Sequence, residues 1–289
     1  MIEFTKMHAA GNDFIVVGET QRIIVPEEEK PVFVEKACRR HFGVGADGAI
    51  FIQKSSKADL KFHFFNPDGS QAEMCGNGIR CMAKYAYEKG LVEEKEITAE
   101  TLAGILKLHL KVVDAKVREV KVDMGAPRIN VEDIPAAGNP GDHIINEEIM
   151  SGGFEHKVTA VGMGNPHAVI QLNNIIEIDV KTIGSRIRNH TALFPNGANV
   201  NFIQQKNQNE YNIRTYERGV EAETLACGTG ICASAVATVL TGKSSPGDEI
   251  IFHARGGDLK VKVDVEDDMP TRVWLTGSAQ KVFEGILSD

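Results

Sequence analysis

The sequence predicts an α/β protein of the α+β kind, built from two pseudo-symmetric, strand-rich domains with one long helix each. Its length of 289 residues suits two domains, since a domain usually takes about 150 residues. Short motifs of the first half return in the second half in the same order. In both halves, segments with alternating or β-branched side chains outnumber those with helical spacing.

Four pairs of motifs carry the internal repeat. They are GNDF at 11–14 with GNPH at 164–167, GAD at 45–47 with GAN at 197–199, GSQAE at 69–73 with GVEAE at 219–223, and CGNGI at 75–79 with CGTGI at 227–231. Each match is short enough to arise by chance. Four of them in one order, at a nearly constant spacing of about 150 residues, indicate a duplicated unit.

Strands and helices follow from the side-chain pattern. After Cys75, apolar residues recur at helical spacing and predict an amphipathic helix that stops near Gly90. After Cys227, the uncharged stretch 231–240, followed by Gly242, predicts a helix enclosed by sheet. The Pro- and Gly-rich region 135–153 is expected to be a loop. Strands are expected at 60–65, 105–113, 117–124, 211–216 and 259–265.

Composition and charge argue against several classes of function. A net charge of −8 disfavours nucleic acid or an anionic membrane as the main partner, because both select clustered Lys and Arg. A small-molecule substrate is the better expectation. The first residues contain Glu3 and no long apolar run, and no later run is long enough to cross a bilayer. We therefore expect a cytoplasmic protein.

The cysteines suggest thiol chemistry. There are five, at 38, 75, 81, 227 and 232, with neither CxxC pairs nor histidine partners at zinc spacing, so we expect reduced thiols and no metal site. Cys75 and Cys227 occupy the same place in the repeat, directly before a predicted helix. A helix N-terminus lowers the pKa of a thiol, and the Gly-x-Gly after each cysteine leaves room for backbone amides to bind a carboxylate.

Two such thiols predict a reaction. If the copies face each other across a cleft, one sulfur lies on each side of a shared ligand. One thiolate would remove a proton from a carbon next to a carboxylate, and the opposite thiol would protonate the other face. No lysine motif for pyridoxal phosphate and no metal cluster is visible, so helix dipoles and exclusion of water must stabilise the carbanion. The residues predict a cofactor-independent amino-acid epimerase with Cys75 and Cys227 as its bases.

The same motifs resemble those of the diaminopimelate epimerase family. NPDGSQAEMCGNGIRC at 66–81 is similar to the family's first active-site signature, and GNDF at 11–14 is typical of it. The remaining blocks are matched by GNPH at 164–167, GAN at 197–199, YERG at 216–219 and ACGTG at 226–230. The resemblance spans nearly the whole chain. Gly48 is a departure, because some members carry Gln there.

The resemblance implies a fold and a reaction. Each domain would be a β-barrel-like sheet around a central helix, with the segment 280–283 returning to the first domain. The domains would comprise 1–124 plus 278–289, and 125–277. The reaction would convert LL-2,6-diaminoheptanedioate to the meso isomer in lysine and peptidoglycan precursor synthesis, without pyridoxal phosphate. A homodimer is compatible with this interpretation, but the sequence does not decide the oligomeric state.

The resemblance also assigns roles to residues. Cys75 and Cys227 would be the acid/base pair, and His167 and Glu217 would tune the cysteine pKa values. The residues that would bind substrate are Asn12, Asn66, Gly76, Asn77, Asn165, Asn199, Glu217, Arg218, Gly228 and Thr229. In this set, the two residues after each cysteine would hold the reacting carboxylate through their backbone amides. Glu217 would also lie near the substrate ammonium.

Simpler structural interpretations stay open for most of these residues. His167 could be a turn residue, and the adjacent Glu217 and Arg218 could be an exposed charged pair. Asn12, Asn66 and Asn199 are also good turn residues. The three remaining cysteines are more simply small buried core side chains, namely Cys38, Cys81 and Cys232.

Two rival functions also stay open. A proline- or hydroxyproline-type racemase is the nearest, although its pocket would be smaller and more apolar than one for a substrate with two amino-acid ends. A thiol-redox protein that cycles a disulfide between Cys75 and Cys227 is a rival of a different class. It would function oxidised, whereas the epimerase requires both sulfurs reduced.

Overall fold

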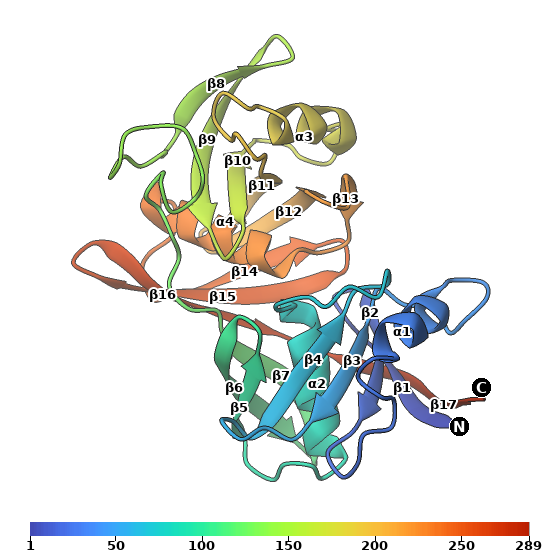
Figure 1. Cartoon of the computed structure of the whole chain (residues 1–289). Helices are drawn as coiled ribbons and strands as arrows, with labels where there is room; N and C mark the ends of the chain where they lie inside the picture. Colours follow the sequence, from blue (N-terminus) through green and yellow to red (C-terminus); the bar gives the residue numbers. More distant parts are fainter. Residues whose placement is uncertain (289) are drawn as a thin grey trace. The chain divides into compact units, whose positions relative to one another are not determined.

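The computed structural model describes residues 1–288 and divides them into two compact units. The first comprises Met1–Asp123 and the segment from Thr276 onward, and the second comprises Met124–Leu275. Figure 1 shows the first unit in blue to green together with the red C-terminal strand. The fold is α/β with a two-domain repeat, as the sequence predicts. No helix within residues 1–288 combines the length and apolar character that crossing a bilayer requires.

The first unit is a curved sheet with two helices. Its elements are, in chain order, β1 (Ile2–Ala9), β2 (Asn12–Gly18), α1 (Lys30–Cys38), β3 (Ala49–Gln53), β4 (Leu60–Phe65), α2 (Gly76–Glu88), β5 (Glu96–Thr101), β6 (Gly104–Val113), β7 (Lys116–Asp123) and β17 (Gln280–Leu287). The three strands expected in this half are confirmed as β4, β6 and β7. Helix α2 packs against β1, β2, β3, β4, β6 and β7, so the sheet surrounds it.

The second unit repeats this plan. Its elements are β8 (Glu147–Ser151), β9 (Phe154–Gly162), β10 (Pro166–Gln171), α3 (Val180–Arg188), β11 (Asn199–Asn207), β12 (Glu210–Glu217), β13 (Ala222–Thr224), α4 (Gly228–Leu240), β14 (Glu249–Ala254), β15 (Gly257–Glu266) and β16 (Met269–Gly277), the last of which crosses the boundary between the units. The strands expected at 211–216 and 259–265 are confirmed as β12 and β15. Helix α4 packs against β9, β10, β11 and β15.

Strand pairing is the same in both units. In the first, β1–β2, β3–β4 and β5–β6 are antiparallel, while β2–β3 and β4–β5 are parallel. In the second, β9–β10, β11–β12 and β14–β15 are antiparallel, while β10–β11 and β12–β14 are parallel. The repeat seen in the motifs is therefore a repeat of topology.

The two central helices differ in chemistry but end alike. The apolar face of α2, which includes Ile79 and Met82, is fully buried, whereas α4 carries no charge on any face and is buried almost throughout. Gly90 and Gly242 follow the helices with φ of 69° and 67°. Glycine adopts this left-handed conformation without strain, which explains why both helices stop where predicted.

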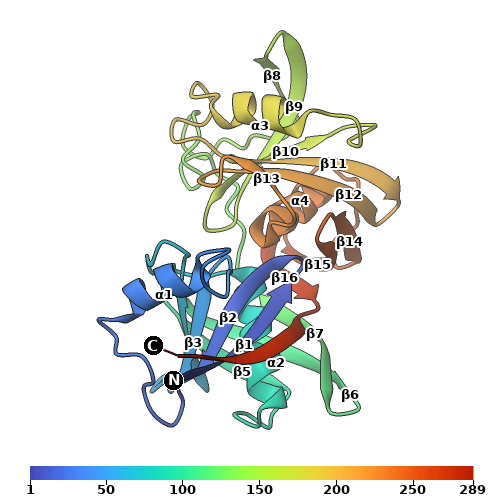
Figure 2. The same cartoon turned by 90° about the vertical axis from the view of Figure 1, so that its right-hand side faces the viewer.

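The edge strand of each unit comes from a different part of the chain. Strand β17 pairs antiparallel with β1, as Figure 2 shows, and the expected return of 280–283 to the first unit is confirmed. Strand β8 pairs antiparallel with β9 in the same way. The loop expected over 135–153 is therefore wrong for Glu147–Ser151. Gly152 and Gly153, with φ of 63° and 83°, form the turn of the β8–β9 hairpin. These glycines follow the strand directly, so the sequence pattern favoured a loop there.

Each unit also holds a second, shorter helix that the sequence pattern did not predict. In α1, Val34 and Ala37 pack on Ile15 and Val17 of β2, while the alternate residues of β2 point to the opposite face of the sheet, where α2 lies. Strand β2 is thus buried on both faces. The fully buried Lys30 opens α1, and a charge at a core position hides the apolar periodicity of the helix.

Candidate active site

Cys75 and Cys227 both occupy the N-cap position of a central helix. Cys75 precedes α2 with an extended backbone (φ −139°, ψ 115°), and Cys227 precedes α4 in nearly the same conformation (φ −115°, ψ 110°). Cys75 is half-buried and Cys227 is buried. Because the first amides of a helix have no partners within it, each sulfur lies where backbone N–H groups and the positive end of the helix dipole favour a thiolate or a bound carboxylate.

Two predicted residues of the first unit, Asn12 and Asn77, lie beside Cys75. The Gly78 N–H donates to Cys75 Sγ at 3.5 Å, and the thiol of Cys75 donates to Asn12 Oδ1 at 3.6 Å. Asn77 Nδ2 donates to the same Asn12 oxygen at 3.2 Å. Asn12 begins β2, so the β1–β2 turn brings its side chain to the start of α2.

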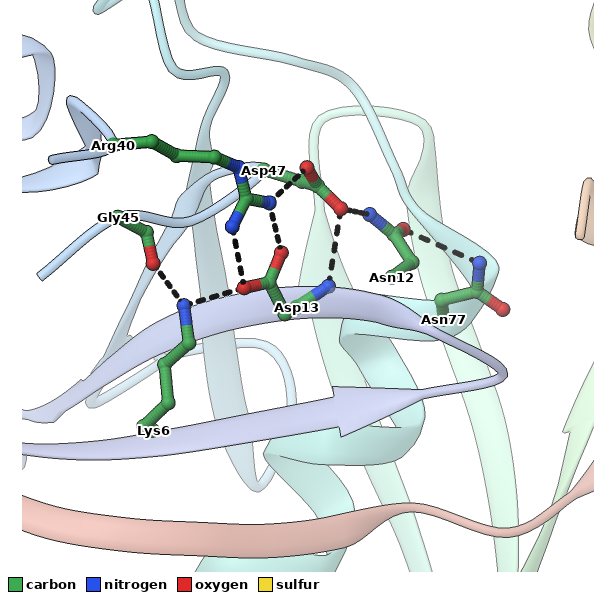
Figure 3. A network of polar contacts seen from close by, with 7 residues as sticks. All are labelled: Lys6, Asn12, Asp13, Arg40, Gly45, Asp47 and Asn77. Carbon is green, nitrogen blue, oxygen red and sulfur yellow. Dashed lines mark hydrogen bonds and ion pairs between the residues drawn. The ribbon is translucent and has the colours of Figure 1, made fainter. Parts of the chain in front are cut away.

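An ionic network, drawn in Figure 3, holds Asn12 from the other side. Asn12 Nδ2 donates to Asp47 Oδ2 at 2.8 Å. Arg40 reaches both Asp47 Oδ1 at 2.8 Å and Asp13 Oδ1 at 2.6 Å. Lys6 pairs with Asp13 and donates to the Gly45 carbonyl. Burial by itself would raise the pKa of Asp13, but its contacts with Arg40 and Lys6 lower that pKa to about 2.

Asn66, in contrast, makes turn contacts. Its backbone N–H donates to the Ser70 carbonyl at 2.8 Å, and its side-chain Nδ2 donates to Ser70 Oγ at 3.0 Å. Asp68 accepts from the backbone N–H and the hydroxyl of Ser70 at 2.9 and 2.6 Å. The structure therefore places Asn66 in a polar turn between β4 and α2.

Cys227 has different neighbours. Its Sγ lies 3.5 Å from the Thr229 hydroxyl, and either group can be the hydrogen-bond donor. A Cβ added at Gly230 would collide with Asn201 Oδ1, so only glycine fits between the first turn of α4 and this amide. The equivalent Gly78 lies against Phe62 and Ile50 instead. The side chains that pack against the first helical turn are therefore polar in the second unit and apolar in the first.

His167 is the centre of a buried polar chain in the second unit. The Thr215 hydroxyl donates to Asn201 Oδ1 at 3.0 Å, which turns Asn201 Nδ2 toward His167 Nδ1 at 3.1 Å. Nδ1 is then an acceptor, so the proton lies on Nε2, which donates to Asn165 Oδ1 at 2.8 Å. Burial, and next the charge of Arg218, lower the pKa of His167 to about 3.

The predicted residues at the end of β12 are also brought together. Asn199 Oδ1 accepts from the Arg218 backbone N–H at 2.8 Å, and Arg218 Nη1 donates to the carbonyls of Asn196 and Gly197, both at 3.2 Å. Burial raises the pKa of Glu217. The adjacent Glu217 and Arg218 are thus not a simple solvated pair.

A cavity of about 350 Å³ opens beside these residues within the second unit. Its lining includes Asn165, Pro166 and Arg218, together with the acidic Glu132 and Asp133. His167 Nε2 donates to the side-chain oxygen of Asn165, so the N–H groups of the Asn165 amide remain for a ligand. The lining therefore offers both hydrogen-bond donors and carboxylates.

The remaining cysteines have the character of core residues. Cys38, Cys81 and Cys232 are buried thiols. Burial raises the pKa of Cys38 to about 12 and also raises the pKa of Cys81. A thiol that does not ionise near neutral pH is a poor base or nucleophile.

Several site residues were not found from the sequence. In the sequence, Asp47 marks only the repeat, Arg80 lies within the motif at 66–81 without an assigned role, and Arg40 belongs to no motif. Asn201 lies two positions after Asn199 on β11, so both side chains leave the strand on the same face. That spacing is the signal that could have identified Asn201.

The family model described as diaminopimelate epimerase matches residues 4–130 and 159–282 of the chain. The chain is 45% identical over 284 residues to a protein of Pelotomaculum thermopropionicum named diaminopimelate epimerase, with 98% of each chain covered. It is 44% identical over 285 residues to a protein of the same name from Moorella thermoacetica, again with 98% of each covered.

Solved structures show the same fold at much lower identity. A PhzF-family phenazine biosynthesis protein from Bacillus anthracis matches with a TM-score of 0.73 and 21% identity, and 99% of each chain is covered. The similarity extends over both repeats, because almost the whole of each chain is superposed.

Proposed function

Because the chain belongs to the diaminopimelate epimerase family, we propose that it interconverts LL-2,6-diaminoheptanedioate and its meso isomer without a cofactor. The product would enter the synthesis of lysine and peptidoglycan precursors. The observation that carries the proposal is the equivalence of Cys75 and Cys227, two thiols at the N-caps of repeated helices.

In the proposed mechanism each cysteine serves one face of the α-carbon. One sulfur, as thiolate, removes the α-proton, and the other, as thiol, delivers a proton from the opposite side. The C–H bond electrons pass into the adjacent carboxylate and return when the new C–H bond forms. Such a reaction needs both sulfurs reduced and within reach of one carbon.

Backbone amides would stabilise the intermediate. Gly76 and Asn77 begin α2, and Gly228 and Thr229 begin α4, so their N–H groups lie among the unpaired amides of the two helix starts. A carboxylate bound there would gain charge as the proton leaves, and donors already in place stabilise that charge without reorganisation.

The polar cavity of the second unit would hold the distal amino-acid end. Arg218 and Asn165 supply donors for its carboxylate, and Asn199 holds Arg218 in place through the backbone. We propose that Glu217 interacts with a substrate ammonium, and that Asn12 and Asn66 contribute from the first unit. His167, with a pKa of about 3, stays neutral, so it would influence the site through the Asn165 amide that it orients.

The test is an assay of the purified, reduced protein with LL-2,6-diaminoheptanedioate, followed by chiral chromatography. Formation of the meso isomer without added pyridoxal phosphate or metal is expected, and chelator should not reduce the rate. L-Proline and trans-4-hydroxy-L-proline are the matched controls and should not be racemised. Turnover of either control, with none of the diamino acid, would replace the proposed function with that of the racemase rival.

A further inference from the structure

A chain of side-chain amides behind Cys75 connects two charged groups of opposite sign. Arg80 Nη2 donates to Asn77 Oδ1 at 2.8 Å, Asn77 Nδ2 donates to Asn12 Oδ1 at 3.2 Å, and Asn12 Nδ2 donates to Asp47 Oδ2 at 2.8 Å. Arg80 is fully buried, and its Nη1 also donates to the Gly76 carbonyl at 2.8 Å. Asn77, Asn12 and Asp47 of this hydrogen-bonded series lie side by side in Figure 3.

The charged ends determine the orientation of both amides. A guanidinium can only donate hydrogen bonds, so the oxygen of Asn77 must face Arg80 and its nitrogen must face Asn12. A carboxylate can only accept, so the nitrogen of Asn12 must face Asp47. Arg40 Nη2 lies 2.8 Å from Asp47 Oδ1 and forms an ion pair with that carboxylate. Asn12 is therefore held from both sides with its oxygen toward Cys75.

This orientation has a consequence for the sulfur. Asn12 Oδ1 lies 3.6 Å from Cys75 Sγ and accepts a hydrogen bond from the thiol. An acceptor in this position stabilises the S–H form and repels a thiolate, which opposes the Gly78 N–H and the helix dipole.

The second repeat provides an internal comparison. Both cysteines are N-caps, so the helix start acts on both and does not distinguish them. Asn165, the repeat counterpart of Asn12, has its carbonyl oxygen bound by His167 Nε2. Cys227 Sγ contacts the hydroxyl of Thr229, which can donate to it. The oxygen of Asn165 is therefore bound by a histidine, whereas the oxygen of Asn12 accepts from the Cys75 thiol and from Asn77.

We propose that Asp47 and Arg80 are positioning residues that, through Asn12 and Asn77, keep Cys75 protonated before substrate binds. Cys75 is then the acid of the pair in the first encounter with substrate, and Cys227, as the thiolate, is the base. The role of Cys75 as the acid rests on the proposed two-thiol reaction. The protonation state itself is a property of the ligand-free protein.

Other charged groups of this unit also face Cys75 or its partners. Lys6 of β1, Asp13 of β2 and Arg40 are paired with one another or with Asp47. Cys81 lies further along α2, and burial raises its pKa. The contact between Cys75 and the Asp47 side of this network runs through the Asn12 oxygen.

The experiment measures the pH midpoint of Cys75 alkylation by iodoacetamide in the full-length, substrate-free protein, with modified peptides identified by mass spectrometry. Asn12→Ala should lower the midpoint by about 0.5–1 pH unit, the size expected for loss of one neutral hydrogen bond to the thiol. If Asn12 presented its N–H to the sulfur, the same variant would raise the midpoint. An increase or no change would overturn the proposal.

Variants of Asp47 test its positioning role. Asp47→Ala should lower the midpoint in the same direction by a smaller amount, because Asn77 still holds Asn12. Asp47→Asn keeps an acceptor oxygen and should restore the wild-type midpoint, whereas a purely electrostatic role would make both variants alike. Asp248→Ala, an exposed aspartate of the second unit, is the control.

A thermal melt of each variant serves as the control for folding. If Asp47→Ala does not fold, Asn12→Ala and Asp47→Asn still decide the outcome, since the proposal requires a lowered midpoint in the first and an unchanged one in the second. No substrate is used, so failure here leaves the assay of the proposed function unaffected.

Discussion

Cys75 and Cys227 hold the same position in two repeats, each as the N-cap of a helix of 13 residues with an extended backbone before it. If they are the two bases, neither can replace the other. Cys75→Ala and Cys227→Ala should each reduce epimerisation by about 1000-fold or more, as expected for loss of an acid/base group. Cys38→Ala, in a buried thiol of raised pKa, should retain the wild-type rate. Near wild-type activity in either active-site variant would remove the two-base assignment.

His167 should make the protein acid-sensitive. Its folded-state pKa of about 3 is below the ordinary 6.5, so the unfolded chain binds the proton more readily. Stability from this group is complete above pH 6.5 and is lost as the pH falls from 6.5 toward 3. Between pH 7 and 5, the unfolding free energy from denaturant titrations should fall about 2 kcal/mol more in wild type than in His167→Gln. Equal losses would show that His167 is not buried in its neutral form.

Glu217 should trade stability against activity. Because burial raises its pKa, its charged form is disfavoured in the folded protein. Glu217→Gln, which removes the charge and keeps the shape, should have an equal or higher Tm. If the carboxylate binds a substrate ammonium, kcat/KM should fall about 10- to 100-fold, the range for one charged hydrogen bond. A lower Tm with unchanged kcat/KM would contradict both parts.

A buried ion pair beneath α1 should matter far more than surface pairs. Lys30 Nζ lies 3.1 Å from Glu19 Oε2, and both side chains are fully buried. Lys30→Met leaves the Glu19 charge without its cation and should cost about 3–5 kcal/mol of unfolding free energy. Lys111→Met, in an exposed pair with Glu119, is the matched control and should cost less than about 1 kcal/mol. Similar values for the two variants would mean that Glu19 has other compensation.

The sequence predicted those parts of the fold that depend on local pattern. The helices after Cys75 and Cys227 and their glycine stops depend on periodicity and backbone conformation, which neighbouring residues specify. Helix α1 was missed because Lys30, a charged residue, occupies a buried position at its start, where it is paired with Glu19 and Glu27. Strand β8 was missed because it is short and lies between glycine- and proline-rich segments.

The site was predictable only where a motif marks it. Asn12 and Asn165 belong to repeated blocks, but their partners differ: Asp47 reaches Asn12 from a distant loop, whereas His167 contacts Asn165 from within the same block. Asn201 acts through a contact with His167, 34 residues away in sequence, which no linear motif records. Polar networks of this kind depend on tertiary packing, so sequence alone suggests their members but not their bonds.

Isotope exchange tests the two-base reaction most directly. In D₂O, at early conversion of LL-2,6-diaminoheptanedioate, the meso product should carry deuterium at the inverted carbon, because its proton comes from a solvent-exchanged thiol. The recovered substrate should still carry protium, since the base that removed the proton lies on the opposite face. Product that retains the substrate's own protium at the inverted carbon would mean that one base does both steps, and would contradict this account.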